Sequence, residues 1–160
     1  MKISKIGEPQ VVGNVPPLES LIHFNGYLYY DTARDDEFGR ELWRTDGTVG
    51  GGRIVKDIRI GTDHSDPRSF LIVNSALLFT VDDGIHGREL WQSDGTGAGT
   101  RLVMDINPGP AESNIQHMTV FNDMLVFSAD DGVHGQELWA FKPNPSASLD
   151  GDMWLHYADE

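Results

Sequence analysis

The chain has 160 residues, 39% of them hydrophobic, a formal net charge of −13 and no cysteine. The hydrophobic content is enough for a packed core, whereas the negative charge disfavours nucleic acids and anionic membrane surfaces as partners. Without cysteine there is no disulfide framework, thiolate metal site or cysteine nucleophile. No apolar run reaches the roughly 18 residues of a membrane span, and no apolar signal-peptide segment follows the first lysines. We therefore expect a globular chain that neither binds nucleic acid nor inserts into a membrane.

A five-residue motif recurs along the chain. Gly-Arg-Glu-Leu-Trp stands at 39–43 and 87–91, and Gly-Gln-Glu-Leu-Trp at 135–139. The tryptophans are 48 residues apart both times, and the central and last units align without a gap. Such self-similarity indicates a repeat architecture.

The elements of the unit follow one order. In the central unit a short apolar run (53–58) precedes a polar loop, and two further apolar runs (70–73 and 76–81) flank an Asn turn at Asn74. An Asp-Asp-Gly-x-His-Gly turn then leads to the Glu-Leu-Trp run, and Asp-Gly-Thr follows it. Short runs rich in Val, Ile and Phe between Asn, Asp and Gly predict strands joined by hairpins.

Four strands per unit, with no 3.6-residue apolar period, predict an all-β chain without helices. We expect a β-propeller of four-stranded blades, three blades per chain. A β-sandwich is the alternative, but it would not explain so regular a repeat. The whole chain, 1–160, is then one repeat domain, with units at approximately 5–52, 53–100 and 101–148, and a tail, 149–160, that is a candidate closing strand.

A family resemblance rests on the longer form of the motif. Residues 41–48 and 89–96 read Glu-Leu-Trp-x-x-Asp-Gly-Thr, and 137–139 repeat the first half. Together with the Asp-Asp-Gly-x-His-Gly and Asp-Ile-x-x-Gly segments, they make the chain similar to the bacterial ELWxxDGT repeat family over roughly 20–142. The resemblance implies a propeller-like build and an extracellular or cell-surface protein, and it implies no particular activity.

The repetition favours a non-catalytic binding or adhesion module, with carbohydrate as the leading ligand class, because repeated weak sites give avidity. A purely structural assembly module and an extracellular glycan-processing hydrolase or lyase are the alternatives. Exposed aromatic residues on a rim would favour a lectin, and buried tryptophans a scaffold. Carboxylates converging in a cleft would favour an enzyme. No catalytic constellation stands out, so we predict that the protein is not an enzyme.

The recurring Glu and Trp residues are the candidate ligand-binding residues. Two residues apart on a strand, they share one face. Each Trp either packs between blades or offers its indole to a sugar, and each Glu either accepts structural hydrogen bonds from Arg or turn amides or contacts the ligand. Since the central unit has neighbours on both sides, its Trp is expected to be the most enclosed. The candidates are Glu41, Trp43, Arg88, Glu89, Trp91, Glu137 and Trp139.

The Asp-Asp-Gly turns are the candidate metal sites, at Asp82, Asp83, Asp130 and Asp131. Ca²⁺ takes six to eight oxygen ligands, so two carboxylates form an incomplete set and any Ca²⁺ would bind weakly. Asp and Gly are also ordinary turn residues. We therefore expect turn formation, with Ca²⁺ the only candidate cofactor.

Three blades are fewer than the four to eight of a closed propeller. The open end faces, including the surroundings of Trp43 and Trp139, would then be apolar and would drive association. We therefore predict a homo-oligomer, with a six-bladed dimer favoured. Either the N-terminal segment 2–6 of another chain or the tail segment 154–157 would complete the last blade.

Overall fold

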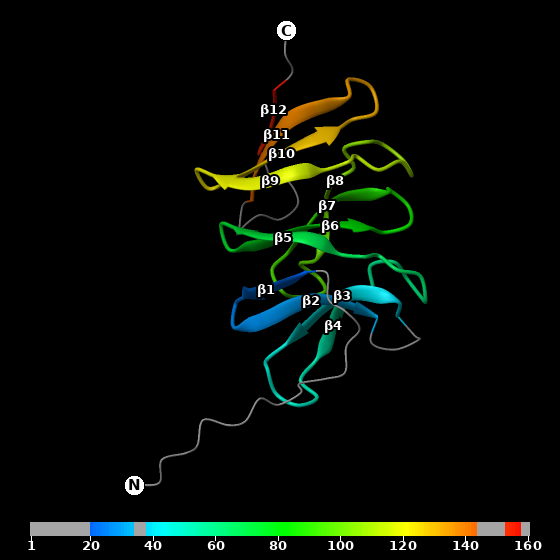
Figure 1. Ribbon diagram of the computed structural model, residues 1–160, viewed down its shortest axis with the longest axis vertical. Coiled ribbons are helices and arrows are strands. Elements are labelled where there is room, and N and C mark those ends of the chain that lie inside the picture. The colour runs from blue at the N-terminus through cyan, green and yellow to red at the C-terminus, as the bar shows by residue number, and fades with distance from the viewer. Residues whose placement is uncertain (1–19, 34–37, 144–152, 158–160) are drawn as a thin grey trace.

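The computed structural model of the chain describes residues 20–33, 38–143 and 153–157, the last of these as backbone only. Within these residues there are strands and turns but no helix, and therefore no helix that could cross a membrane. Three antiparallel four-stranded sheets are stacked along the long axis (Figure 1). The all-β prediction is confirmed.

Each sheet is an up-and-down meander whose strand order follows the chain. The strands of the first sheet are β1 (Leu21–Phe24), β2 (Tyr27–Ala33), β3 (Arg40–Thr45) and β4 (Arg53–Lys56). Those of the second are β5 (Arg68–Val73), β6 (Ala76–Asp82), β7 (Arg88–Ser93) and β8 (Arg101–Met104). Those of the third are β9 (Gln116–Phe121), β10 (Met124–Asp130), β11 (Gln136–Lys142) and β12 (Met153–Tyr157). The sheets are blade-like, and they do not close into a ring within the chain, so a propeller stays a prediction.

The predicted Asn turns connect the first two strands of every sheet. Their central φ angles are 47° and 80° at Asn25–Gly26, 48° and 63° at Asn74–Ser75, and 47° and 60° at Asn122–Asp123. Positive φ at both central residues is the type I′ geometry, whose twist matches that of the flanking strands. Asn tolerates this region better than most residues, which explains its recurrence here.

The core lies between the sheets. We call the sheet face that carries the motif Trp the front face, and the face that carries the motif Leu the rear face. Phe24, Tyr29 and Leu42 on the rear of the first sheet pack against Phe79 and Trp91 on the front of the second. The front of the third sheet contributes Phe127 and Trp139 to a second cluster with Val73, Leu78 and Leu90 on the rear of the second. The repeat therefore builds the same interface twice.

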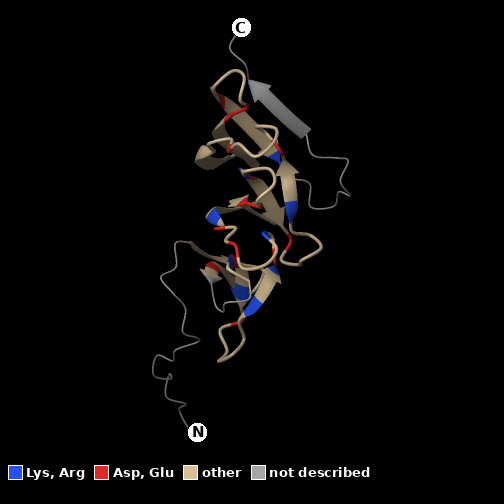
Figure 2. Ribbon diagram, turned by 90° about the vertical axis from the view of Figure 1, so that its right-hand side faces the viewer, with Lys and Arg blue, Asp and Glu red and all other residues tan. Residues whose placement is uncertain are grey.

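The tail forms the closing strand of the third sheet. β12 pairs with β11 from Met153 opposite Lys142 to Tyr157 opposite Leu138. The competing N-terminal segment 2–6 lies outside the described residues. Among the residues that the structure describes, most Asp and Glu side chains belong to the loops between strands (Figure 2).

Candidate functional site

Glu41 lies at the junction of the first and second sheets. Its side chain on β3 is fully buried. One oxygen, Oε2, accepts hydrogen bonds from the Ile58 amide (2.9 Å) and the Ser65 hydroxyl (2.7 Å), and Oε1 accepts one from the Arg59 amide (3.2 Å). The three donors belong to the loop 57–67, which connects the first sheet to the second. Glu41 thus holds the connecting loop against β3.

Glu89 repeats this arrangement one unit later. Oε2 accepts hydrogen bonds from the Ile106 amide (3.1 Å) and the Ser113 hydroxyl (2.7 Å). Oε1 is buried and accepts no hydrogen bond of good geometry among the described residues, although a weaker contact with the Asn107 amide helps to lower the pKa of the carboxylate. Of the two predicted roles, structural hydrogen bonding is the one that the geometry favours, with loop amides and a serine hydroxyl as donors.

The two serines also join neighbouring sheets through their backbone. Ser65 donates its amide to the Arg40 carbonyl on β3 (3.0 Å) and accepts a bond from the Asp82 amide on β6 (3.0 Å). Ser113 accepts the corresponding bond from Asp130 on β10 (2.8 Å). Each serine therefore links the carboxylate, its own loop and the next sheet.

Burial controls the protonation of both carboxylates. Desolvation raises the pKa of Glu41 to about 7, against the lowering effect of its hydrogen bonds to Ile58 and Ser65. Desolvation likewise raises the pKa of Glu89 to about 7, against the hydrogen bonds from Ser113 and Ile106. Such a pKa suits a general acid or base, but neither side chain has any exposed surface through which a substrate could reach it.

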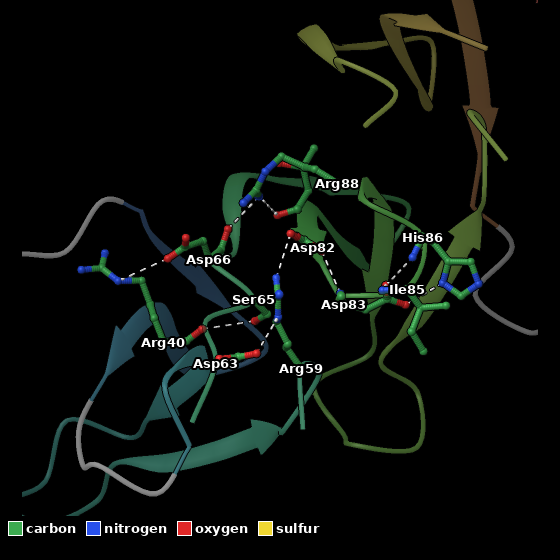
Figure 3. Close-up of polar contacts among 12 residues, drawn as sticks. Arg40, Arg59, Asp63, Ser65, Asp66, Asp82, Asp83, Ile85, His86 and Arg88 are labelled. Atoms are coloured by element: carbon green, nitrogen blue, oxygen red, sulfur yellow. Dashed lines mark hydrogen bonds and ion pairs between the residues drawn. The ribbon is translucent and has the colours of Figure 1, made fainter. Parts of the chain in front are cut away.

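The arginine candidate is engaged with the backbone. Arg88 donates from one guanidinium nitrogen to the carbonyls of Asp66 (2.8 Å) and Thr80 (3.4 Å), and burial lowers its pKa. It lies in the polar network between the first two sheets shown in Figure 3. There Arg59 also pairs with Asp82, at 3.0 Å. Arg88 therefore supports the sheet junction, and Glu89 takes its hydrogen bonds from the next loop.

All three motif tryptophans are buried. Trp43, Trp91 and Trp139 are 6%, 6% and 5% exposed, so the expectation that Trp91 is the most enclosed was wrong. Trp139 does not lie on an open end face, because its front face packs against the second sheet. Its indole nitrogen donates to the Ala129 carbonyl (3.3 Å). As they stand, the three indoles have little surface on which a sugar could stack.

The Asp-Asp-Gly turns are closed by their own aspartates. Asp83 accepts hydrogen bonds from the Ile85 and His86 amides and contacts the His86 imidazole at 2.7 Å. Burial opposes ionisation of Asp83, but these bonds outweigh it and lower the pKa. The contact with Asp83 raises the pKa of His86. The turn thus contains an aspartate–histidine pair whose imidazole is partly exposed.

The remaining candidate aspartates have similar local roles. Asp82 accepts a bond from the Gly84 amide (2.8 Å), and Asp130 accepts one from Gly132 (2.8 Å). In the third sheet Asp131 and His134 repeat the pair at 2.7 Å. Two hydrogen bonds lower the pKa of Asp131. The larger effect comes from the bond that the His134 amide donates, and the next from the bond with the His134 ring.

One of these turns brings together three groups that could hold a metal ion. Ligand atoms of Asp131, His134 and Glu137 all lie within 4.8 Å of one another. The equivalent Glu89 in the second sheet is fully buried by its loop, whereas Glu137 is half-buried. The sequence prediction placed the metal at paired aspartates and did not include His134 or Glu137 in the ligand set.

A polar pocket of about 310 Å³ lies beside the β3–β4 hairpin. Tyr27, which is 36% exposed, stacks on the Arg44 guanidinium at 4.4 Å from the ring centre, and Arg44 donates to the Gly95 carbonyl (2.7 Å). Asp46 and Arg53 complete the charged lining. Sequence reasoning missed this pocket. The available signal was that Tyr27 and Arg44 interrupt the repeat, since the later units have Ala76 or Met124 and Gln92 or Ala140 there.

The described part of the chain is thus an all-β stack of repeated sheets, with motif residues engaged at the sheet junctions and one polar pocket outside them. No family model, curated protein or solved structure matches the chain. The likeness to the ELWxxDGT repeat family therefore stays a prediction from the motif itself.

Proposed function

We propose that the chain is a non-catalytic binding module that recognises carbohydrate through the Tyr27–Arg44–Asp46–Arg53 pocket. The observation that supports this is an exposed aromatic ring beside charged hydrogen-bonding groups in a concave site. An aromatic face packs against the C–H groups of a sugar ring, and ionised side chains form strong hydrogen bonds to its hydroxyls. The volume of the pocket is at the lower end of the range for ligand-binding pockets, which suits a single sugar unit.

The pocket is firmly built. Arg53 donates to the Gly50 and Gly52 carbonyls, both at 2.7 Å. Asp46 accepts bonds from the amide and hydroxyl of Thr48, and the hydroxyl bond lowers its pKa. Asp46 is therefore ionised near neutral pH, and little conformational entropy remains to be lost when a ligand binds.

A glycan array with the wild-type chain, in calcium and in chelator, tests this proposal. Tyr27→Ala and Asp46→Asn should reduce binding at least tenfold, whereas Val133→Ala, in an exposed turn of the third sheet, should bind normally. No binding by the wild-type chain, or equal binding by all variants, would refute it.

An assembly role is the second candidate. It is favoured by the packing of Trp91 and Trp139 between sheets and by the burial of Glu41 and Glu89 at the sheet junctions. In that role the repeat stacks sheets into a rigid rod or ring. For either role we propose an extracellular or cell-surface location, as the family resemblance implies.

Metal binding is a separate proposal. Ca²⁺ at the Asp-Asp-Gly turns would compete with amide groups that already occupy oxygens of Asp82, Asp83, Asp130 and Asp131. The mixed donor set of one imidazole and two carboxylates suits Zn²⁺ better than Ca²⁺. Calorimetric titration with each ion, against a His134→Ala variant, tests the choice. Strong Ca²⁺ binding that survives this substitution would contradict it.

A further inference from the structure

The rear face of the third sheet exposes apolar residues that the other two sheets bury. At the motif leucine, Leu42 and Leu90 have no exposed surface, whereas Leu138 is 52% exposed. At the Asn turn, Phe24 and Val73 are 3% and 2% exposed, and Phe121 is 60% exposed. The cause is the position of the sheet in the stack, because rear faces are covered only by the sheet that follows.

This face is also hollowed. A groove of about 440 Å³ is lined by Phe121, Met124, Val126, Leu138 and Ala140, together with His117 and Thr119. None of its lining residues is Asp, Glu, Lys or Arg. In a chain with a net charge of −13, it is a surface on which two copies can meet without bringing like charges together.

The opposite end of the stack exposes a smaller apolar surface. On the front face of the first sheet, Tyr30 and Trp43 are both 6% exposed and Thr32 is fully buried, so the exposed large apolar side chains there are Leu21 (54%) and Leu28 (37%). A head-to-tail ring would require this face to receive the rear face of another copy. The larger apolar surface, with its groove, is therefore at the rear end, and the best match for it on a partner copy is the same end.

We infer that the rear face of the third sheet is a self-association surface, on which a second copy docks back to back through its own third sheet. A two-fold axis lets one patch serve both copies and uses that patch up in one contact, so the assembly stops at two chains. The paired sheets would lie about 10 Å apart, as packed sheets do. The dimer differs from a six-bladed ring, because the two stacks meet at one interface only. The inference is consistent with the assembly role and does not depend on glycan binding, since the pocket at Tyr27 lies in the first sheet.

Light scattering after size exclusion, at tens of micromolar chain, tests the interface. The wild-type chain should have twice the mass of one chain, and Leu138→Glu should be monomeric with an unchanged circular dichroism spectrum. Two controls should remain dimeric. Val133→Glu changes an exposed turn of the same sheet, and Leu28→Glu changes the front face of the first sheet, where Leu28 is partly exposed.

A second measurement keeps the test valid if Leu138→Glu fails to fold. Because the chain has no cysteine, a Leu138→Cys variant carries a single thiol, and a short bis-maleimide should link the two copies efficiently. A Leu28→Cys variant should not be linked. A monomeric wild-type chain, a dimer that survives Leu138→Glu, or efficient linking only at position 28 would overturn the back-to-back dimer. Glycan binding by a monomeric Leu138→Glu variant would separate this result from the proposed function.

Discussion

Glu89→Gln should remove a defined part of the pH dependence of stability. Burial raises the pKa of Glu89 from 4.5 to about 7 in the folded chain. The native state therefore holds this proton more tightly than the unfolded chain does, and protonation favours folding. The stabilisation is complete below about pH 4.5, and it is lost as the pH rises through about 7.

The size of the effect follows from the two pKa values. One pKa unit corresponds to about 1.4 kcal/mol, so the interval from 4.5 to about 7 is worth roughly 3 kcal/mol. The pKa of Glu41 is raised over the same interval. The raised pKa of His86 also makes stability fall as the pH rises.

Gln is a suitable replacement for Glu89 because it is neutral at every pH. Its carbonyl can accept the bonds from Ile106 and Ser113, and its NH₂ group takes the Oε1 position, where only the weak contact with the Asn107 amide is lost.

Urea unfolding followed by tryptophan fluorescence, at fixed chain concentration from pH 4 to 8, measures this effect. The wild-type chain should lose stability steadily over the interval, and Glu89→Gln should lose about 3 kcal/mol less. Glu112→Gln is the matched control, because it removes an exposed carboxylate and should leave the slope unchanged. A Glu89→Gln variant with the wild-type slope would show that Glu89 is not desolvated, and the reasoning would fail.

Two further substitution series test the packing. Trp43→Ala, Trp91→Ala and Trp139→Ala should each destabilise by about 3–5 kcal/mol and melt within a few degrees of one another, since the three are equally buried; a much milder effect at one position would show that its indole is not enclosed. Gly87→Ala should cost about 2 kcal/mol or more, because its φ is +69° and a Cβ would lie 2.5 Å from the Ala111 carbonyl oxygen. Gly135→Ala, with φ +81° and no atom within 4 Å, should cost about 1 kcal/mol in thermal melting. Equal losses at the two glycines would contradict the close approach.

The strands and turns could be predicted because each is encoded locally. Asn25, Asn74 and Asn122 specify their turns within two residues, and the apolar runs between them have strand length. The function of Glu41 could not be read in the same way, because its donors come from a loop about 20 residues further along the chain. Ser65 and Ser113 recur with the same spacing as the tryptophans. Their repetition was therefore visible in the sequence, but nothing there indicated that they bind Glu41 and Glu89.

The direction of stacking was also hidden in the sequence. Trp139 and Leu138 are adjacent on one strand, and alternation places them on opposite faces. Only the fold shows that the Trp face meets the preceding sheet and the Leu face meets the following one. The exposed end was therefore predicted around Trp139, whereas it lies around Leu138. The pocket at Tyr27 was missed for another reason, since it depends on residues that differ from the repeat.

Each serine and its carboxylate lie 24 residues apart in sequence, at Ser65 with Glu41 and at Ser113 with Glu89. The polar link between one sheet and the next is thus contained in a segment shorter than one repeat. A gene duplication that copies a whole unit also copies this link, together with the front and rear faces that pack against the neighbouring sheets. Loss of a unit would likewise leave the other junctions intact. Arrays of this kind can lengthen or shorten in evolution without a new solution to the folding problem, because their energetics couple only neighbouring units.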